Sequence, residues 1–281
     1  MITAGLSAIA ALGWGAADYF GARASRSVPA GLVVLLSQTL GLPVLMIWLL
    51  ATRSARPELS SLLWGVCAGA VGLLGMVLLY RTLAAEGVTL VAPVTAVTAA
   101  VVPLAVGLFT QASPGLLALC GVFCAIASIA LVNRAARAER GAVAVRTLLL
   151  ALAAGGALGL QLVFLSHPGP SAGLWPMVGA RACSILGAIP LVLLVLRHRG
   201  QSATTRVPWL VVGLAGALDT AGFAFYLFAM EHGLLGVVGP IVSLYPGATI
   251  MLAIALDSER VTRSQLVGLG LGAGALLLVA F

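Results

Sequence analysis

Two charged side chains stand deep inside long apolar stretches of this 281-residue chain. Arg181 lies in the stretch 173–196 and Asp219 in the stretch 207–230. At about 1.5 Å of rise per residue, Arg181 lies roughly 12 Å from the start of its stretch and Asp219 roughly 16 Å from the end of its own. Those two ends face the same side of a membrane if both stretches span it, so the two groups have similar depth.

An ionisable side chain inside a membrane span costs about 2.5 to 3.5 kcal/mol, which makes both residues candidates for a functional role. Two interpretations stay open. In the first, Arg181 and Asp219 form a structural ion pair between neighbouring helices. In the second, Asp219 binds a substrate ammonium group or a proton, and Arg181 is its partner or anchors a carboxylate.

Aromatic and amide side chains also fall near the middle of apolar stretches. Each one alone is more often a packing residue, but as a set they could line a solute cavity. Trp14 and Tyr245 are the preferred contacts for an apolar or cationic group. The candidate lining residues are Trp14, Tyr80, Gln161, Tyr226 and Tyr245, with Gln38 as a weaker member.

Asp18 is a further candidate, placed three residues before the end of the first apolar stretch, 2–21. Because this position is close to a membrane interface, we expect solvation to explain it better than a functional role. Glu86, Glu231 and His232 stand at the ends of stretches, where we expect them to anchor helices at the interface.

The composition predicts an integral membrane protein. Hydrophobic residues make up 61% of the chain and charged residues only 8%, against about 25% charged in a soluble domain. The net charge is +7, and all fifteen basic residues are Arg. Most of them are placed between apolar stretches. We therefore interpret the basic balance as membrane topology and expect no nucleic-acid partner.

The cysteines indicate neither a metal nor a disulfide. All four fall inside apolar stretches without His or acidic partners, and we expect small buried side chains there. They are Cys67, Cys120, Cys124 and Cys183. We expect no bound metal and no cofactor.

A bilayer core of about 30 Å needs about 20 apolar residues per helix, and the chain holds ten such stretches. The sequence thus predicts an all-α integral membrane protein with ten transmembrane helices. They are placed at 2–21, 28–51, 60–82, 87–109, 114–133, 147–166, 173–196, 207–230, 234–256 and 263–281.

The second half of the chain repeats the first. Gly87 aligns with Gly233 at an offset of 146, and Pro93 with Pro240 at an offset of 147. Five helices in each half place the second copy upside down, which is the inverted repeat typical of secondary transporters. We predict a first repeat at 1–134, an Arg-rich linker at 135–146 and an inverted second repeat at 147–281.

The arginines predict the orientation. Loops after the odd-numbered helices hold twelve arginines and the opposite side holds two, Arg53 and Arg56. Arginine-rich loops stay in the cytoplasm, so both termini are predicted to lie outside the cell membrane.

The residues resemble the EamA family of the drug/metabolite transporter superfamily. The first helix carries LGWGAADYF at 12–20, similar to the opening motif of the family. The segment LDSERVT at 256–262, followed by Gln265 and Gly268, resembles the pattern that joins the last two helices of each half. Arg181 matches the arginine usual in the second helix of a half, whereas Ser37 stands at that place in the first half.

The resemblance implies transport of small organic molecules, often export of amino acids, other metabolites or drugs. It also implies cytoplasmic termini, which conflicts with the arginine count, and both orientations stay open. In the distantly related small multidrug-resistance proteins an acidic residue of the first helix takes a proton or a drug, which makes Asp18 of interest.

The most favoured function is a secondary transporter that exports an amino-acid-like or cationic compound by alternating access between the repeats. A lipid-moving or purely structural membrane protein is the alternative, and an intramembrane enzyme is less favoured because the three histidines lie at stretch ends or in loops. Glycines spaced by four, as at Gly65 and Gly69, allow close helix packing. We expect them to pack within a monomer, with a homodimer through the last helix as the alternative.

Overall fold

The computed structural model describes residues 2–52, 58–86, 88–110, 145–168, 172–199, 206–232 and 245–257, with six single residues between 238 and 274. The secondary structure within these residues is helical. The helices are α1 (Ile2–Ser25), α2 (Ala30–Leu40), α3 (Leu42–Thr52), α4 (Leu59–Glu86), α5 (Val88–Thr110), α7 (Val145–Ser166), α8 (Trp175–Arg199), α9 (Trp209–His232) and α11 (Tyr245–Asp257). The predicted span at 114–133, all but four residues of the predicted span at 263–281, and most of the linker lie outside the described residues.

Five helical segments are long and apolar enough to cross a membrane: Ala30–Thr52, Leu59–Glu86, Val145–Ser166, Trp175–Val195 and Trp209–His232. Large apolar side chains point outward on several of them. Leu50 is 74% exposed, Leu186 68% and Leu210 78%. Water solvates such apolar faces poorly, whereas lipid chains solvate them well. This surface therefore suits a bilayer. The Ala- and Gly-rich α1 is not among the five, so the number of spans stays a prediction.

The predicted span at 28–51 is divided into α2 and α3 at Gly41. Pro43 follows two residues later and has no N–H to donate to the carbonyl of Thr39, so the regular helix is interrupted there. The matching Pro190 lies inside α8 without dividing it. The other described helices begin and end within a few residues of the predicted stretches, with one exception. The predicted span 234–256 is described as a continuous helix only from Tyr245 onward, as α11.

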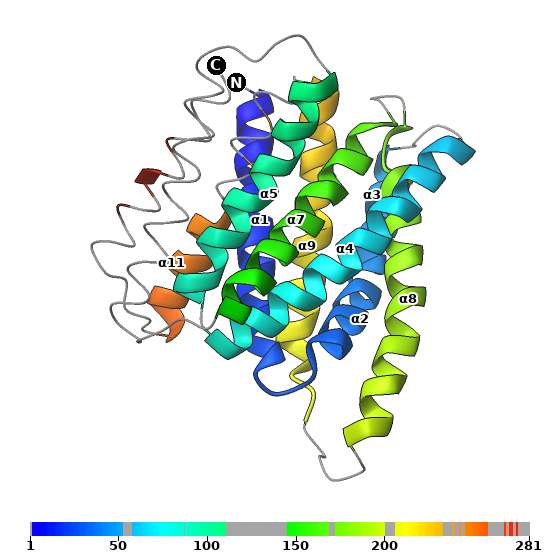
Figure 1. Ribbon diagram of the computed structural model, residues 1–281. Helices are drawn as coiled ribbons and strands as arrows, with labels where there is room; N and C mark the ends of the chain where they lie inside the picture. Colours follow the sequence, from blue (N-terminus) through cyan, green and yellow to red (C-terminus); the bar gives the residue numbers. More distant parts are fainter. Residues whose placement is uncertain are drawn as a thin grey trace.

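The helices of the two halves pack in matching pairs. α1 packs along α9 as α4 packs along α7, and α1 meets α11 as α7 meets α5. Likewise, α2 lies against α9 as α8 lies against α4. In Figure 1, α1 descends from the N-terminus whereas α7 rises, so the first helices of the two halves run in opposite directions. This arrangement agrees with a repeat whose second copy is turned over.

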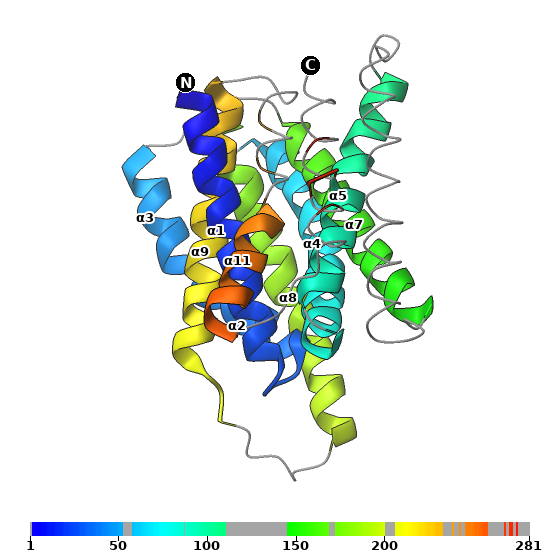
Figure 2. The ribbon, with the colours of Figure 1, turned by 90° about the vertical axis from the view of Figure 1, so that its left-hand side faces the viewer.

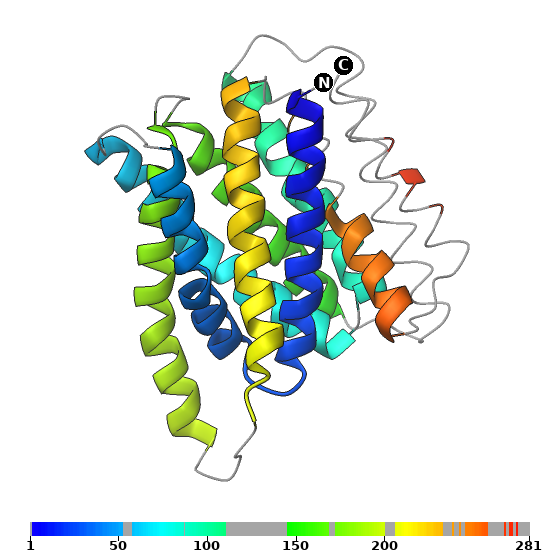
Figure 3. The ribbon, with the colours of Figure 1, turned by 180° about the vertical axis from the view of Figure 1, so that it is seen from behind.

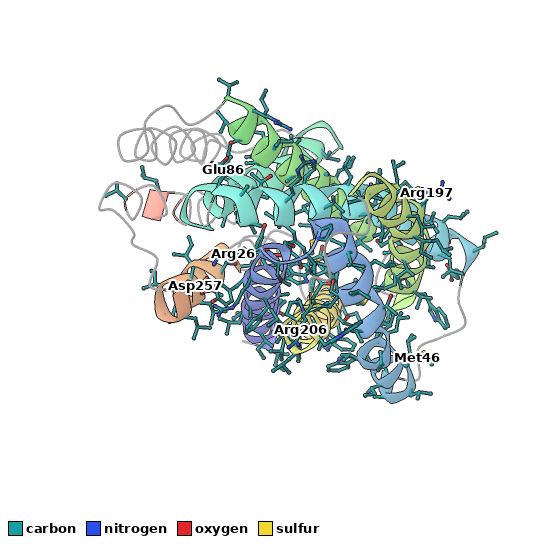
Figure 4. The ribbon with its side chains drawn as sticks, turned by 90° about the horizontal axis from the view of Figure 1, so that it is seen from below. Arg26, Met46, Glu86, Arg197, Arg206 and Asp257 are labelled. Atoms are coloured by element: carbon teal, nitrogen blue, oxygen red, sulfur yellow. The ribbon has the colours of Figure 1, made fainter. Side chains whose placement is uncertain are left out.

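One end of the helix bundle carries several arginines. α1 ends and α9 begins at the lower end in Figures 1 and 3, while the N-terminus lies at the upper end. The view from below in Figure 4 shows Arg26, Arg197 and Arg206 at this lower face. We call it the Arg-rich end.

One buried apolar cluster fills the bundle near the Arg-rich end. Its largest side chains come from α1, α4 and α5, and α11 covers it on one side. Figure 2 shows α11 beside α1. We call this cluster the lower core. It includes Tyr19, Ala22, Leu79, Tyr80, Val91, Ile250 and Ala253.

Candidate functional site

A buried polar cluster joins α2, α8 and α9 at the centre of the bundle. The guanidinium of Arg181 donates from Nη2 to Oδ2 of Asp219 at 2.6 Å and to Oγ1 of Thr220 at 3.1 Å. Its Nη1 donates to Oε1 of Gln38. Arg181 is only 3% exposed and Asp219 7%. The ion pair that their depths suggested is therefore formed, and two neutral side chains accept further hydrogen bonds from the guanidinium.

Glycines let the backbones of these helices approach closely enough for the cluster to form. A Cβ on Gly216 of α9 would collide with the carbonyl oxygen of Ser37 on α2. Similarly, a Cβ on Gly69 of α4 would collide with the backbone of Ala180, directly before Arg181. Gly65 and Gly69 thus pack within this chain, against α8. Helices that cross on glycine can place short polar side chains within hydrogen-bonding distance.

The cluster borders a cavity of about 70 Å³. Since one water needs roughly 10 to 15 Å³ by this measure, the cavity has room for about five waters or a small organic group. Both halves of the chain contribute to its wall. The lining residues are Trp14, Asp18, Gln38, Gly72, Met76, Ala99, Leu158, Gln161, Leu162, Leu165, Met177, Ala180, Arg181, Ser184, Asp219, Phe223 and Tyr245.

Asp18 lines this cavity and is buried, whereas a solvated position near the end of the first helix was expected. The residue is 8% exposed. The reason is that α1 continues to Ser25, four residues beyond the predicted end at 21, which moves Asp18 away from the helix end. Among the hydrogen bonds and ion pairs of the described residues, none involves Asp18. A carboxyl group in this setting lacks the partner that usually offsets the cost of burial.

Aromatic rings form one wall of the cavity. The ring of Trp14 packs edge-on against Phe223 with centroids 4.7 Å apart, and Arg181 lies over Phe223 at 5.7 Å. The buried Nε1–H of Trp14 has no acceptor among the described residues. The nitrogen faces α9, because a Cβ built on Gly222 would lie 2.9 Å from it.

The predicted lining residues divide into two groups. Trp14, Asp18, Gln161, Arg181, Asp219 and Tyr245 line the cavity together. Tyr80 and Tyr226 do not belong to its lining. Both are buried, with hydroxyl groups that have no partner among the described residues. Tyr80 lies in the lower core, and the ring of Tyr226 is 5.5 Å from that of Trp14.

The sequence reasoning gave too little weight to Gln38 and did not find Thr220, Ser184 or Phe223. Gln38 and Thr220 complete the hydrogen bonds of Arg181. Ser184 follows Arg181 by three residues and Phe223 follows Asp219 by four. Helical spacing of three or four residues from each charged position would have placed these two on the same helix face.

Comparison with known proteins adds a family and a fold. The model of the EamA-like transporter family matches residues 1–134 and again 145–281. No curated protein matches the chain. A solved structure described only as a crystal structure of a protein is similar, with 17% sequence identity and a TM-score of 0.67. That match covers 96% of this chain and 94% of the other, so the two share the fold along nearly their whole length.

Proposed function

The chain belongs to the EamA-like transporter family, and from this premise we propose that it exports a small organic solute across the cell membrane. The family match covers both halves and, with the apolar helices, makes the chain a multi-pass membrane protein. The proposed solute is amino-acid-like or cationic. Alternating access between the two repeats would carry it, because the cavity is lined by helices of both.

The charge inventory of the cavity carries the proposal. Its described lining holds one guanidinium, from Arg181, and two carboxyl groups, from Asp18 and Asp219. Asp219 has its counter-ion in Arg181 at 2.6 Å, which leaves Asp18 as the carboxyl group without one. An ammonium group or a proton would supply the missing positive charge. Arg181 is already occupied by Asp219, Thr220 and Gln38, so we no longer favour it as a carboxylate anchor.

The rest of the cavity suits the carbon skeleton of such a solute. Apolar and aromatic side chains predominate in the lining, and Trp14, Phe223 and Tyr245 are the aromatic ones. Aromatic faces attract cations within about 6 Å, and more strongly where water is excluded. A small organic cation with an apolar body therefore fits the chemistry of the wall better than an inorganic anion does.

The test is thermal unfolding of the detergent-purified protein against a panel of amino acids, nucleobases, sugars and organic cations. A solute present at about 100 times its dissociation constant should stabilise the folded state by about 2.7 kcal/mol. We expect the hit to be an amine or another cation and to lose its effect in Asp18→Asn. The matched control is Glu231→Gln, an exposed carboxyl group at the end of α9, which should keep the hit.

A hit that survives in Asp18→Asn would remove Asp18 from the site. Silence across the whole panel would favour the alternative, a lipid-moving or structural membrane protein, and reconstituted lipid-movement assays would follow. An intramembrane enzyme stays the least favoured function. The described lining of the cavity contains no histidine, and His167 stacks on Trp64 at 4.1 Å.

A further inference from the structure

Asp257, the last residue of α11, collects three hydrogen-bond donors from the end of α1. Arg26 Nη1 approaches Oδ2 at 2.9 Å, the hydroxyl of Tyr19 donates to Oδ1 at 3.0 Å, and Nη1 of Arg23 contacts Oδ1. Arg23 also donates to the hydroxyl of Tyr19 at 2.8 Å. Figure 4 shows Arg26 and Asp257 near one another at the Arg-rich end. These four residues, which we call the Asp257 network, tie the first half of the chain to the second.

The Asp257 network closes the lower end of a continuous seam between α1 and α11. Higher in the seam, Oγ1 of Thr249 donates to the carbonyl of Gly15 at 2.9 Å. A Cβ on Gly15 would collide with the carbonyl oxygen of Tyr245, so the two helices touch there without side chains between them. Tyr245 lines the cavity and Tyr19 belongs to the lower core. The seam and the lower core therefore separate the cavity from the Arg-rich end.

The equivalent positions at the opposite end of the molecule cannot form such a network. The offset of 147 carries Asp257 onto Thr110, and the offset of 146 carries Tyr19 onto Leu165 and Arg23 onto Gly169. None of these three residues is ionisable. Leu165 itself lines the cavity, whereas Tyr19 does not, so the cavity extends toward the end where these equivalent positions hold no ionisable side chain.

From this difference between the halves we propose that the Asp257 network is the gate of the transporter at the Arg-rich end. The network holds α1 on α11, keeps the cavity closed to that end and must break before a solute can pass. The proposal rests on the proposed transport function, since only a transporter needs to open this seam.

The surroundings of the network suit a gate that opens repeatedly. The side chains of Arg23 and Arg26 are 45% and 43% exposed, whereas that of Asp257 is 15% exposed. Water and salt can therefore replace the arginines as partners of the carboxylate. By contrast, Arg181 and Asp219 have side chains only 4% and 10% exposed, and their pair is shielded from salt.

The test places a single reporter cysteine on either side of the seam in a protein whose four native cysteines are replaced by serine or alanine. Ala253→Cys lies in the lower core and is 0% exposed, so it should react slowly with a polar maleimide while the gate is closed. Ser184→Cys lines the cavity and reports on the opposite opening. We expect Asp257→Asn to raise the labelling rate at position 253 about two- to fivefold, the range that exposed ion pairs support. Labelling at position 184 should fall in the same variant.

Two further measurements keep the test decisive if Asp257→Asn folds poorly. Arg26→Gln removes one exposed partner and leaves the carboxylate in place, and it should shift both labelling rates in the same directions. A higher salt concentration should shift both labelling rates in the same directions in the protein whose Asp257 network is intact. Arg197→Gln is the matched control, because Arg197 is exposed at the same end and has no ion pair among the described residues.

Unchanged labelling at both positions in Asp257→Asn, Arg26→Gln and high salt would overturn the gate. An equal effect of Arg197→Gln would also overturn it, since the shift would then follow net charge and not the network. Failure of the gate and failure of transport are distinguishable. If transport is wrong, the labelling shifts occur but no solute on the panel binds; if only the gate is wrong, a solute binds and labelling does not shift.

Discussion

At the scale of single residues, the two aspartates of the cavity have opposite surroundings. Oδ2 of Asp219 is 2.6 Å from Nη2 of Arg181. The same Nη2 also donates a hydrogen bond to the neutral side chain of Thr220. Asp18 has neither an ion pair nor a hydrogen bond among the described residues, although it is equally buried. One carboxyl group therefore contributes to the fold, and the other stays available for a ligand at a cost to the empty protein.

We predict that Asp18→Asn separates stability from binding. The substitution replaces a buried carboxyl group that has no partner among the described residues by a neutral amide, so the free energy of unfolding of the solute-free protein should stay equal or rise by about 1 to 3 kcal/mol. Affinity for a cationic solute should fall about ten- to a hundredfold, which corresponds to the loss of one charge-assisted hydrogen bond of about 1.5 to 3 kcal/mol. Thermal unfolding and equilibrium binding on the same preparation check both. A clear loss of stability would mean that Asp18 has a structural partner after all.

For Arg181 and Asp219 we predict strong coupling. Arg181→Met or Asp219→Asn alone leaves one buried charge without its partner and should cost about 3 to 5 kcal/mol of unfolding free energy. The double variant should cost less than the sum of the two, because neither charge is then left alone. A double-mutant cycle by denaturant or thermal unfolding measures this. If the two losses are additive, the interaction between Arg181 and Asp219 contributes little to the free energy of unfolding.

At this scale the sequence predicted the pair but not its neighbours. Arg181 and Asp219 were found because a charge inside an apolar stretch is conspicuous, and their depths follow from the rise per residue. The burial of Asp18 was not predictable, because it depends on where α1 ends, and small polar residues do not mark that end clearly. Gln38 was underestimated because an amide is common near helix ends and its partner lies 143 residues away.

At the scale of helices, close crossings on glycine fix the distances in the site. α2 crosses α9 where Gly216 meets the carbonyl of Ser37, and Gly41 meets Thr220 of the polar cluster. A side chain at either crossing would push apart the helices that carry Gln38 and Asp219. The geometry of the cluster thus depends on residues without side chains.

We predict that Gly216→Ala lowers the free energy of unfolding by about 1 to 3 kcal/mol, since its Cβ would meet backbone that cannot rotate away. The matched control is Gly5→Ala, where no atom lies within 4 Å of the added Cβ. In α1 that change should be neutral or stabilise by up to about 1 kcal/mol, because Ala is the better helix former. Thermal unfolding distinguishes them, and equal effects of the two substitutions would argue against the close crossing.

Helix positions were predictable from apolar stretch length, and the described helices agree with them to within a few residues except where α2 meets α3 and in the described part of the ninth stretch. The break at Gly41 was missed because the apolar pattern continues through it, and only the combination of Gly41 and Pro43 marks it. Pairing between helices could not be predicted from pattern, since lipid-facing and buried positions are both apolar in a membrane protein.

At the scale of the whole molecule, the matching packing of the two halves explains where the cavity forms. Both halves contribute helices to the lining, and the opposite directions of α1 and α7 place equivalent surfaces at opposite ends (Figure 1). Aligned glycine and proline positions were enough to predict the internal repeat from the sequence. Only the packed helices show that surfaces of the two repeats meet around Asp18 and Arg181.

The orientation in the membrane remains our prediction, with both termini outside and the Arg-rich end in the cytoplasm. A reporter enzyme that is active only outside the cytoplasm, fused after Phe281, should be active, and one that works only in the cytoplasm should be silent. The reverse pattern would place the termini inside, as the family resemblance implies. The Asp257 network would then lie at the outer end.

The position of the Asp257 network at the Arg-rich end has a kinetic consequence. An ion pair within the protein cannot change the concentration ratio that a solute reaches across the membrane, which only an external driving force sets. It does change the share of molecules that are accessible from each side at rest, and apparent affinity falls in proportion to that share. Passive exchange through this protein should therefore half-saturate at a higher solute concentration from the Arg-rich side. Loss of the network would bring the two half-saturation values closer without altering the final distribution of the solute.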